Sequence, residues 1–281
     1  MNGEAPLLLR LGILRIFDTL HILLPMRTIY NWCRYAFNLK VLLRNANFIK
    51  SGAPDGLPIP PPFLIHEVSG VYDQRAFYDN GVDGAECIRD ILHRNDLAIE
   101  GFESILDFGC GCGRVLRHWQ NLTSTKIYGT DYNPRLVAWC SEHLPLVTCS
   151  VNSLSAHLDY PGGTFDFIYA ISVFTHLTED LQAPWRDELY RVLKPGGYAL
   201  FTFQGSHHQH RLTEGERKAF AAGKLIVQQS RYPGMNTCQV FHPEAYVRAL
   251  FSQGGDVVDF IPGGSTDAGR QDVVVVRRVT K

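Results

Sequence analysis

The chain has 281 residues, enough to bury a sizeable hydrophobic core as one large domain or as one domain with an appendage. Its apolar content of 45% and charged content of 20% are ordinary for a globular protein, and its net charge of -1 gives no reason to expect a nucleic-acid partner. Positive charge gathers at the start: residues 1–50 hold seven Lys and Arg against two Asp and Glu, whereas the rest holds 20 against 26.

The seven cysteines are odd in number and irregularly spaced, and most of them lie in apolar stretches. We interpret them as reduced, buried side chains in a reducing compartment, which indicates a cytoplasmic location. Cys110 and Cys112 form a C-x-C pair, but no third or fourth ligand lies nearby in the sequence. We therefore expect no metal site.

Residues 1–50 form a basic, amphipathic segment with two helical stretches, at about 5–24 and 26–47. The first is long enough to span a membrane, but three charged residues and a histidine interrupt it, and it lacks the cleavage pattern of a signal peptide. Two interpretations stay open. The segment packs on the main domain or on another subunit, or it lies peripherally on an anionic membrane surface.

Residues 51–62 hold five prolines and two glycines, a composition typical of a stiff, extended linker. We place a domain boundary there and assign residues 63–281 to one main domain. Within that domain, residues 204–241 form a connection long enough to be an insertion that covers or walls a substrate.

Strand and helix patterns alternate along the main domain. Such alternation predicts a doubly wound α/β fold, in which a mostly parallel sheet carries helices on both faces. We expect strands at about 103–108, 126–130, 146–151, 165–171 and 198–203, and helices at about 84–97, 114–122, 134–144 and 178–193.

The pattern changes near the end of the chain. After a helix at about 243–253, only a short loop joins strands at about 256–261 and 272–276. A right-handed crossover between parallel strands needs more chain than that, so we expect the last strand to be antiparallel.

The first strand runs into a loop with glycine at three alternate positions, Gly109, Gly111 and Gly113. Such a loop lets a ligand approach the backbone closely. The spacing differs from the G-x-G-x-x-G of dinucleotide folds, and Asp107 just before the loop would repel a phosphate. A carboxylate at this point suits a ligand with an ammonium group.

Polar residues also follow the next two strands. Asp131 ends the second strand, where a carboxylate can accept hydrogen bonds from both hydroxyls of a ribose. Asn152 and Ser153 follow the third strand and are placed to contact the edge of an adenine, with Leu154 or Tyr132 on its face. The ligand inferred is an adenosine with a positively charged, amino-acid-like tail and no phosphate, a description that S-adenosylmethionine fits.

These stretches resemble the class I S-adenosylmethionine-dependent methyltransferases. The matching segments, in the order and spacing of that family, are LDFGCGCG (106–113), YGTDYN (128–133), FDFIYAISVFTHL (165–177) and LYRVLKPGGYALFTF (189–203). The resemblance implies a Rossmann-like fold, S-adenosyl-L-methionine as the cofactor, and methyl transfer as the activity.

The resemblance also implies roles for single residues. The loop glycines pack beneath the methionine moiety, and Asp107 lies close to its amine. Asp131 takes the ribose hydroxyls, and Tyr132 flanks the adenine. Asn152 stands where the family often has an Asp, and Ser172 begins the loop beside the sulfonium. The expected cofactor contacts are Asp107, Gly109, Cys110, Gly111, Gly113, Asp131, Tyr132, Asn152, Ser153 and Ser172.

Methyl transfer from a sulfonium is an in-line displacement, for which the protein mainly aligns the nucleophile and excludes water. A hydroxyl acceptor also needs a base. His176, after the fourth strand, and His207 and His208, after the fifth, lie where the acceptor is expected, and each is a candidate base. Helix capping by His176, and an exposed histidine-rich loop without a catalytic role, are the alternatives for these residues.

No motif identifies the acceptor. The chain has no basic face for nucleic acid, and the Asn/Asp-Pro-Pro-Tyr/Phe tetrad typical of base or glutamine methylation does not follow the fourth strand. We expect a small-molecule acceptor, with a glycan or lipid-linked precursor at the membrane as the second option. A non-catalytic module that binds the cofactor is the main alternative function. A nicotinamide oxidoreductase is a third hypothesis, and the Asp107 carboxylate argues against it.

Overall fold

The computed structural model describes residues 33, 35–267 and 269–279. The chain divides into two compact units, Met1–Ser51 and Gly52–Lys281. The helix predicted at 5–24 lies outside the described residues.

In the N-terminal unit, helix α3 (Leu39–Ser51) begins after Asn38, whose side-chain oxygen accepts a hydrogen bond from Val41 N at 3.2 Å. This N-cap interrupts the helix predicted over 26–47, whose bounds are therefore wrong. Within the described part of the chain, no helix combines the length and apolar character that a membrane span requires. Four large apolar side chains among the described residues of this unit are exposed, namely Phe37, Leu39, Leu43 and Ile49.

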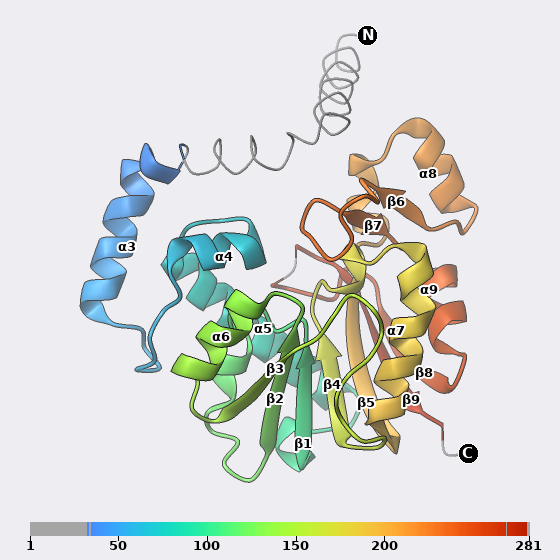
Figure 1. Cartoon of the computed structure of the whole chain (residues 1–281). Helices are drawn as coiled ribbons and strands as arrows, with labels where there is room; N and C mark the ends of the chain where they lie inside the picture. The colour runs from blue at the N-terminus through green and yellow to red at the C-terminus, as the bar shows by residue number, and fades with distance from the viewer. Residues whose placement is uncertain (1–32, 34, 268, 280–281) are drawn as a thin grey trace. The chain divides into compact units, whose positions relative to one another are not determined.

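The second unit is built on a sheet with the strand order β3-β2-β1-β4-β5-β9-β8 (Figure 1). Strands β1 to β5 pair in parallel, and β9 is antiparallel to both of its neighbours. The predicted Rossmann-like sheet with an antiparallel last strand is confirmed. The strands are β1 (Ser104–Phe108), β2 (Lys126–Asp131), β3 (Val147–Val151), β4 (Phe165–Ala170), β5 (Leu193–Phe203), β8 (Gly255–Ile261) and β9 (Asp272–Arg278).

Side chains of the strands alternate between two hydrophobic clusters, one on each face of the sheet. On β1, Ile105 belongs to one cluster and Leu106 to the other. The first cluster includes residues of α4 (Pro62–Ser69), α5 (Gln74–Arg94) and α6 (Pro134–His143), and the second includes residues of α7 (Glu179–Val192) and α9 (Glu244–Phe251). Helices therefore cover both faces, as a parallel sheet requires.

Helix α5 starts ten residues earlier than the predicted helix at 84–97. Its N-cap is Asp73, whose carboxylate accepts a hydrogen bond from Ala76 N at 3.0 Å. The sequence contains this capping signal, but two glycines inside the helix obscure the apolar periodicity.

The helix predicted at 114–122 is wrong, because this segment forms turns and a short 3-10 helix, η2 (Leu116–Trp119). Helix α5 occupies the neighbouring space. A Cβ on Gly81 of α5 would lie 2.2 Å from the carbonyl oxygen of Arg114, so the two backbones are in close contact. Tertiary packing has overridden local helix propensity here.

The segment before α4 is fixed by a buried ion pair. Arg117, which is 1% exposed, donates hydrogen bonds to both carboxylate oxygens of Asp55 at 2.7 and 2.9 Å, and to the carbonyl oxygens of Leu57 and Pro58. Part of the predicted linker at 51–62 is therefore held against the folded core. Burial alone would raise the pKa of Asp55, but the hydrogen bonds and charge of Arg117 outweigh it and hold that pKa below its usual value.

The predicted insertion at 204–241 follows β5 and carries η4 (Ser206–Arg211), α8 (Glu214–Ala221), β6 (Ile226–Gln228) and β7 (Gln239–Phe241). A capping box between Thr213 and Glu216 starts α8. Strands β6 and β7 pair as a separate antiparallel hairpin, which Figure 1 shows beyond the carboxyl ends of β4 and β5.

Replacing Asp55 by Ala is expected to lower the free energy of unfolding by about 3–5 kcal/mol, because Arg117 would stay buried without its partner. The loss should shrink in acid, since the contribution of a carboxylate with a lowered pKa disappears as the pH falls through that pKa. Urea unfolding at pH 7 and at acidic pH measures both effects. The exposed Asp83, replaced by Ala, is the control, and an equal loss in both variants would contradict the assignment.

Candidate active site

The glycine loop leaves β1 with a backbone that only glycine adopts readily. Gly109, Gly111 and Gly113 have φ of 80°, 56° and 77°. A Cβ at these positions would lie 2.3 Å from Val173, 2.7 Å from Val68 and 2.4 Å from Leu144, respectively. The loop is also tied to β2, because the amides of Gly109 and Cys110 both donate to the carbonyl oxygen of Thr130. The glycines are thus required for packing as well as for backbone conformation.

Asp131, at the end of β2, is 7% exposed and faces this loop. One carboxylate oxygen accepts a hydrogen bond from Gly111 N at 2.9 Å, and the other accepts one from Asn133 N at 2.8 Å. Burial raises its pKa against these two hydrogen bonds. Each oxygen keeps a further lone pair, so the oriented carboxylate can accept two more hydrogen bonds.

Asp107, on β1 just before the loop, is 4% exposed. Burial raises its pKa to about 8, although a hydrogen bond with Tyr169 and the charge of Arg114 act in the opposite direction. Tyr169 is itself held by Trp119, whose indole nitrogen donates to the tyrosine oxygen at 2.9 Å. A cation that reached Asp107 would favour the ionised carboxylate and lower this pKa.

Asn152 follows β3 and presents a buried side-chain oxygen that has no hydrogen-bond partner among the described residues. Its Nδ2 is engaged, donating to Ser153 O at 2.8 Å. An unsatisfied buried acceptor of this kind is unusual and suits a ligand with an N–H group. The Ser153 hydroxyl already has a partner, since it donates a hydrogen bond to Ser155 O at 3.0 Å.

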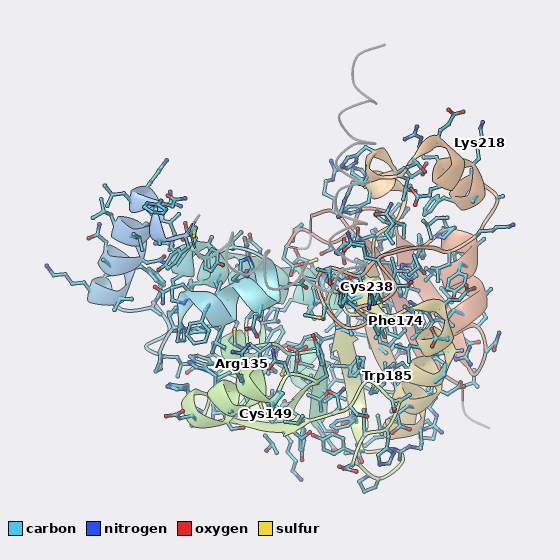
Figure 2. The ribbon with its side chains drawn as sticks, turned by 45° about the horizontal axis from the view of Figure 1, so that its top comes forward. Arg135, Cys149, Phe174, Trp185, Lys218 and Cys238 are labelled. Carbon is cyan, nitrogen blue, oxygen red and sulfur yellow. The ribbon has the colours of Figure 1, made fainter. Side chains whose placement is uncertain are left out.

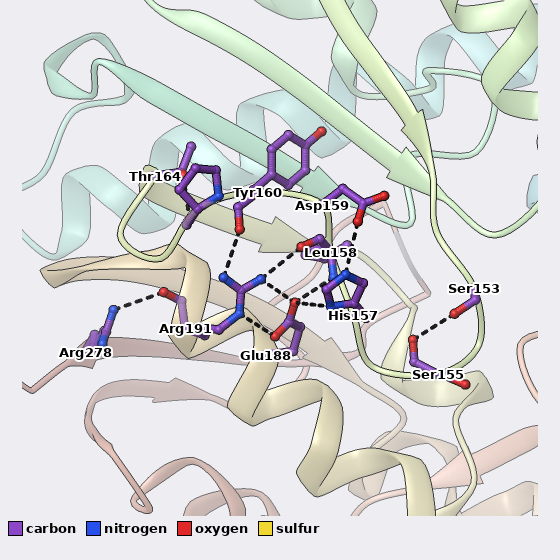
Figure 3. Close-up of polar contacts among 11 residues, drawn as sticks. Ser153, Ser155, His157, Leu158, Asp159, Tyr160, Thr164, Glu188, Arg191 and Arg278 are labelled. Carbon is purple, nitrogen blue, oxygen red and sulfur yellow. Dashed lines mark hydrogen bonds and ion pairs between the residues drawn. The ribbon is translucent and has the colours of Figure 1, made fainter.

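The connection that follows Asn152 is anchored to helix α7 (Figure 3). Glu188 accepts a hydrogen bond from Leu158 N at 2.6 Å, and Arg191 donates to the carbonyl oxygens of Leu158 and Tyr160 at 2.9 and 2.8 Å. Arg191 also forms an ion pair with Glu188. Burial alone would raise the pKa of Glu188, but these hydrogen bonds outweigh it and lower that pKa.

Ser172, which follows β4, has φ of 63°, in the left-handed region that a serine rarely adopts. Hydrogen bonds hold it there: its amide donates to Thr202 Oγ1 at 2.7 Å, and its hydroxyl accepts from Gln271 Nε2 at 2.8 Å. Backbone strain of this kind concentrates at functional sites.

His176 lies four residues further and is mostly buried, with its Nδ1 2.6 Å from Cys238 O. Because a carbonyl oxygen only accepts, Nδ1 carries the proton and Nε2 keeps a lone pair. Burial lowers the pKa of His176, so the ring is neutral near pH 7. A neutral imidazole with an unprotonated Nε2 can act as a base.

Residues 229–238, which join β6 to β7 and are called the strap below, reach across this part of the site. Gly234 N donates to His176 O at 2.8 Å, and Asn236 Nδ2 donates to Glu67 O on α4 at 2.7 Å. A Cβ on Gly234 would lie 2.7 Å from Leu154 and 3.5 Å from Tyr132. Sequence reasoning identified the insertion but not these contacts, because Glu67 and Asn236 are 169 residues apart in the chain.

His207 and His208 lie in η4 and face a different element, the connection between β8 and β9. A Cβ on Gly263 would lie 3.3 Å from His207 Nδ1, and His208 has a hydrogen bond with the backbone of Gly269. Burial lowers the pKa of His208. The structure thus separates the three predicted histidines into one against the strap and two against the β8–β9 connection.

Arg211, at the end of η4, was not singled out by the sequence. Its guanidinium donates to Gln204 Oε1 at 2.8 Å and Gln239 Oε1 at 2.9 Å, and it lies over the Phe241 ring. Its charge contributes to lowering the pKa of His176. Among the described residues, no carboxylate forms an ion pair with Arg211. The side-chain amides of Gln204 and Gln239 orient its guanidinium, and an anionic ligand could bind to it.

The C-x-C pair does not act as a unit in the structure. The Sγ atoms of Cys110, Cys140 and Cys149 all lie within 4.8 Å of one another, and Cys112 is not part of this group. Cys140 and Cys149 are 30 and 39 residues away from Cys110 in the chain, so no local pattern in the sequence groups them with it.

The chain is similar to known methyltransferases. Residues 106–201 match the methyltransferase domain family. Phosphoethanolamine N-methyltransferase 3 of Arabidopsis thaliana is 28% identical over 143 residues, which are 49% of this chain and 28% of that protein. A tRNA N(3)-methylcytidine methyltransferase of Drosophila melanogaster is 26% identical over 196 residues, 66% of this chain and 58% of that protein. The chain therefore spans only part of the length of these relatives.

Solved structures show the same fold at low identity. A SAM-dependent methyltransferase from Methanosarcina mazei superposes with a TM-score of 0.52 and 19% identity, covering 68% of this chain and 98% of that one. A chain from the complex of a methyltransferase with the Trm112 activator of Haloferax volcanii gives 0.54 and 15% identity, covering 79% and 100%.

Replacing Glu188 by Ala is expected to lower the free energy of unfolding by about 1.5–3 kcal/mol, because the charged hydrogen bonds to Leu158 N and Arg191 are lost. Thermal or urea unfolding measures the change. Asp159, whose side chain is 92% exposed and lies 3.0 Å from His157 Nε2, is the matched control, and its Ala variant should stay within about 0.5 kcal/mol of the parent. Equal effects would refute the anchoring role of Glu188.

Proposed function

We propose that this member of the class I S-adenosylmethionine-dependent methyltransferases transfers a methyl group to an oxygen or nitrogen nucleophile of a small molecule. The central observation is the trio of buried acceptors at adjoining strand ends: Asp107 near the end of β1, Asp131 at the end of β2 and Asn152 just after β3. Three acceptors in that order suit an ammonium group, a ribose diol and an adenine amine.

The described residues fit S-adenosylmethionine. Asp131 would bind the ribose hydroxyls with the lone pairs that its backbone hydrogen bonds leave available. The unpartnered oxygen of Asn152 would accept from the adenine amine, and Tyr132, which is 37% exposed, would cover the ring. When bound, the cofactor supplies an activated methyl group on a sulfonium.

The residues of this chain would then align and protect the reacting groups. The strap excludes water on the side of Tyr132 and Leu154, and Ser172 fixes the loop next to the sulfonium. His176 is the candidate base for a hydroxyl acceptor, since its Nε2 can take the proton while Nδ1 stays bound to Cys238 O.

The acceptor is proposed to carry an anionic group, such as a carboxylate or phosphate, that Arg211 can bind. Relatives of this chain are named as methyltransferases of phosphoethanolamine, tRNA cytidine and sterols, so the shared domain does not define the acceptor. The insertion that carries Arg211 lies outside the matched family region at 106–201. Methylation assays with paired anionic and neutral acceptors test this preference.

We also propose that the N-terminal unit binds a membrane surface or another subunit, and that a glycan or lipid-linked acceptor is the second option. The exposed apolar side chains near α3 and the positive charge of residues 1–50 support a contact of this kind. Full-length protein is expected to co-sediment with anionic liposomes, and a 51–281 fragment is not. Equal sedimentation of both would exclude a membrane contact through the N-terminal unit.

Calorimetric titration tests the cofactor assignment. S-adenosylmethionine and S-adenosylhomocysteine are expected to bind and NAD is not, because the glycine spacing of the loop differs from that of dinucleotide folds. Tight NAD binding without a response to the adenosyl ligands would overturn the proposal. Cofactor binding without turnover on any acceptor would instead favour a non-catalytic binding module.

Asp107 is expected to couple cofactor binding to pH. With a pKa of about 8 it is mostly protonated in the unbound protein at pH 7, so binding of an ammonium group should release close to one proton. Affinity should rise as the pH increases from 6.5 towards 8. Titrations in buffers of different ionisation enthalpy measure the released proton.

Asp107→Asn is expected to weaken binding roughly 10- to 100-fold and to abolish the proton release. At a pH between the pKa of Asp107 in the unfolded chain and its pKa in the folded protein, the buried carboxyl destabilises the fold. The Asn variant should therefore have a Tm at pH 7 no lower than that of the parent. Unchanged proton release in the variant would rule out Asp107 as the source.

His176→Gln is expected to reduce kcat for a hydroxyl acceptor by about 10²–10⁴-fold while leaving cofactor affinity unchanged. Cofactor affinity and turnover are measured separately, with His207→Ala and His208→Ala as the comparison. Full activity of the His176 variant would exclude His176 as the base. A large loss of activity in His207→Ala or His208→Ala would instead assign the base to that histidine of η4.

A further inference from the structure

Three cysteines from separate elements meet beneath the glycine loop. Cys110 lies in the loop, Cys140 on α6, and Cys149 on β3 at the face of the sheet that carries α6 (Figure 2). Their sulfurs all lie within 4.8 Å of one another, and all three thiols are unoxidised. Cys110 and Cys140 are buried and Cys149 is half-buried.

The space for these sulfurs is created by a glycine on the strand between them. Gly129 on β2 pairs in register with Cys149 on β3. A Cβ on Gly129 would lie 3.0 Å from Cys110 Sγ and 3.2 Å from Cys110 Cβ. Any other residue at this position would therefore push Cys110 away from its two partners.

A fourth donor atom lies beside two of these sulfurs. The carbonyl oxygen of Gly111 is 3.4 Å from Cys140 Sγ and 3.6 Å from Cys110 Sγ. Zinc bonds of about 2.3 Å to sulfur and 2.1 Å to oxygen place tetrahedral ligands about 3.8 Å apart for two sulfurs and about 3.6 Å for sulfur and oxygen. The two sulfur–oxygen distances already match, and the sulfurs need to approach by about 1 Å at most.

The chemistry of the donors selects the ion. Thiolates bind soft and borderline ions and not magnesium or calcium. Three thiolates with a divalent ion leave one net negative charge in a buried region, whereas a monovalent ion would leave two, and an uncompensated buried charge is costly. A divalent ion of the zinc class fits best.

We propose that Cys110, Cys140 and Cys149 bind a divalent zinc-class ion, with the carbonyl oxygen of Gly111 as the fourth donor. All four positions are then filled by protein, which is the arrangement of a structural site. The ion braces the glycine loop against α6 and β3 and takes no part in methyl transfer.

The site is linked to the candidate cofactor site through one residue. Gly111 directs its carbonyl oxygen at the thiols, and its N–H donates to Asp131 Oδ2 at 2.9 Å. Ion binding therefore fixes the loop that orients the Asp131 carboxylate. This coupling rests on the proposed function, whereas ion binding itself does not.

The experiment uses the full-length, reduced chain after treatment with a chelator. Titration with Co²⁺ is expected to give a thiolate-to-metal charge-transfer band that saturates at about one ion per chain and that Zn²⁺ abolishes. Cys140→Ser and Cys149→Ser should lose the band. Cys112→Ser, the partner in the C-x-C pair, and Cys87→Ser, a buried thiol near Gly264, should keep it.

Thermal unfolding gives a second measurement. Zn²⁺ should raise Tm in the parent and in Cys87→Ser, but not in Cys149→Ser, whose half-buried position makes it the variant best suited to fold without the ion. Circular dichroism of the metal-free variants checks that they fold. No thiolate band in the parent, or a band that survives Cys149→Ser, overturns the proposal.

Titration with S-adenosylmethionine separates the two proposals. A chain that binds Co²⁺ through these thiols but does not bind the adenosyl ligand keeps the metal site and loses the proposed function. A chain that binds the ligand without any thiolate band keeps the function and loses the metal site.

Discussion

The site depends on a turn that has no room for side chains. At the end of β1 the chain crosses from the sheet toward η2, and Val173, Val68 and Leu144 each fill the space where a Cβ would project from one of the three loop glycines. These contacts come from the loop after β4, from α4 and from the end of α6. Side chains therefore pack against the turn from three directions, and the Gly111 amide is held where it donates to Asp131.

Electrostatics set the character of the site. Asp107 and Asp131 are both buried, and burial raises the pKa of each. Two buried carboxyl groups with raised pKa values lower the free energy of unfolding near neutral pH. Such a cost is typical of residues that are retained for binding. Placed at the ends of neighbouring strands, they make the site attractive to a cation and to hydroxyl donors and unfavourable for a phosphate.

The insertion completes the site from a distance in sequence. Its strap is bound to α4 through Asn236 and to the post-β4 loop through Gly234, while η4 supplies Arg211. The matched methyltransferase domain ends at residue 201, so these contacts belong to a part of the chain that the family match does not cover.

The sequence alone determined the sheet, its antiparallel last strand and the carboxylates at the ends of β1 and β2, because apolar strands and the glycines between strand and helix are local signals. The helix predicted at 114–122 was wrong, because α5 packs too closely against this segment for a helix to form. The sequence also could not show which of the three histidines lies against the strap and which lie against the β8–β9 connection. Only the tertiary structure brought Cys140 and Cys149 to Cys110, and Asn236 to Glu67. Contacts of this kind join residues far apart in the chain, and no local pattern records which of them will meet.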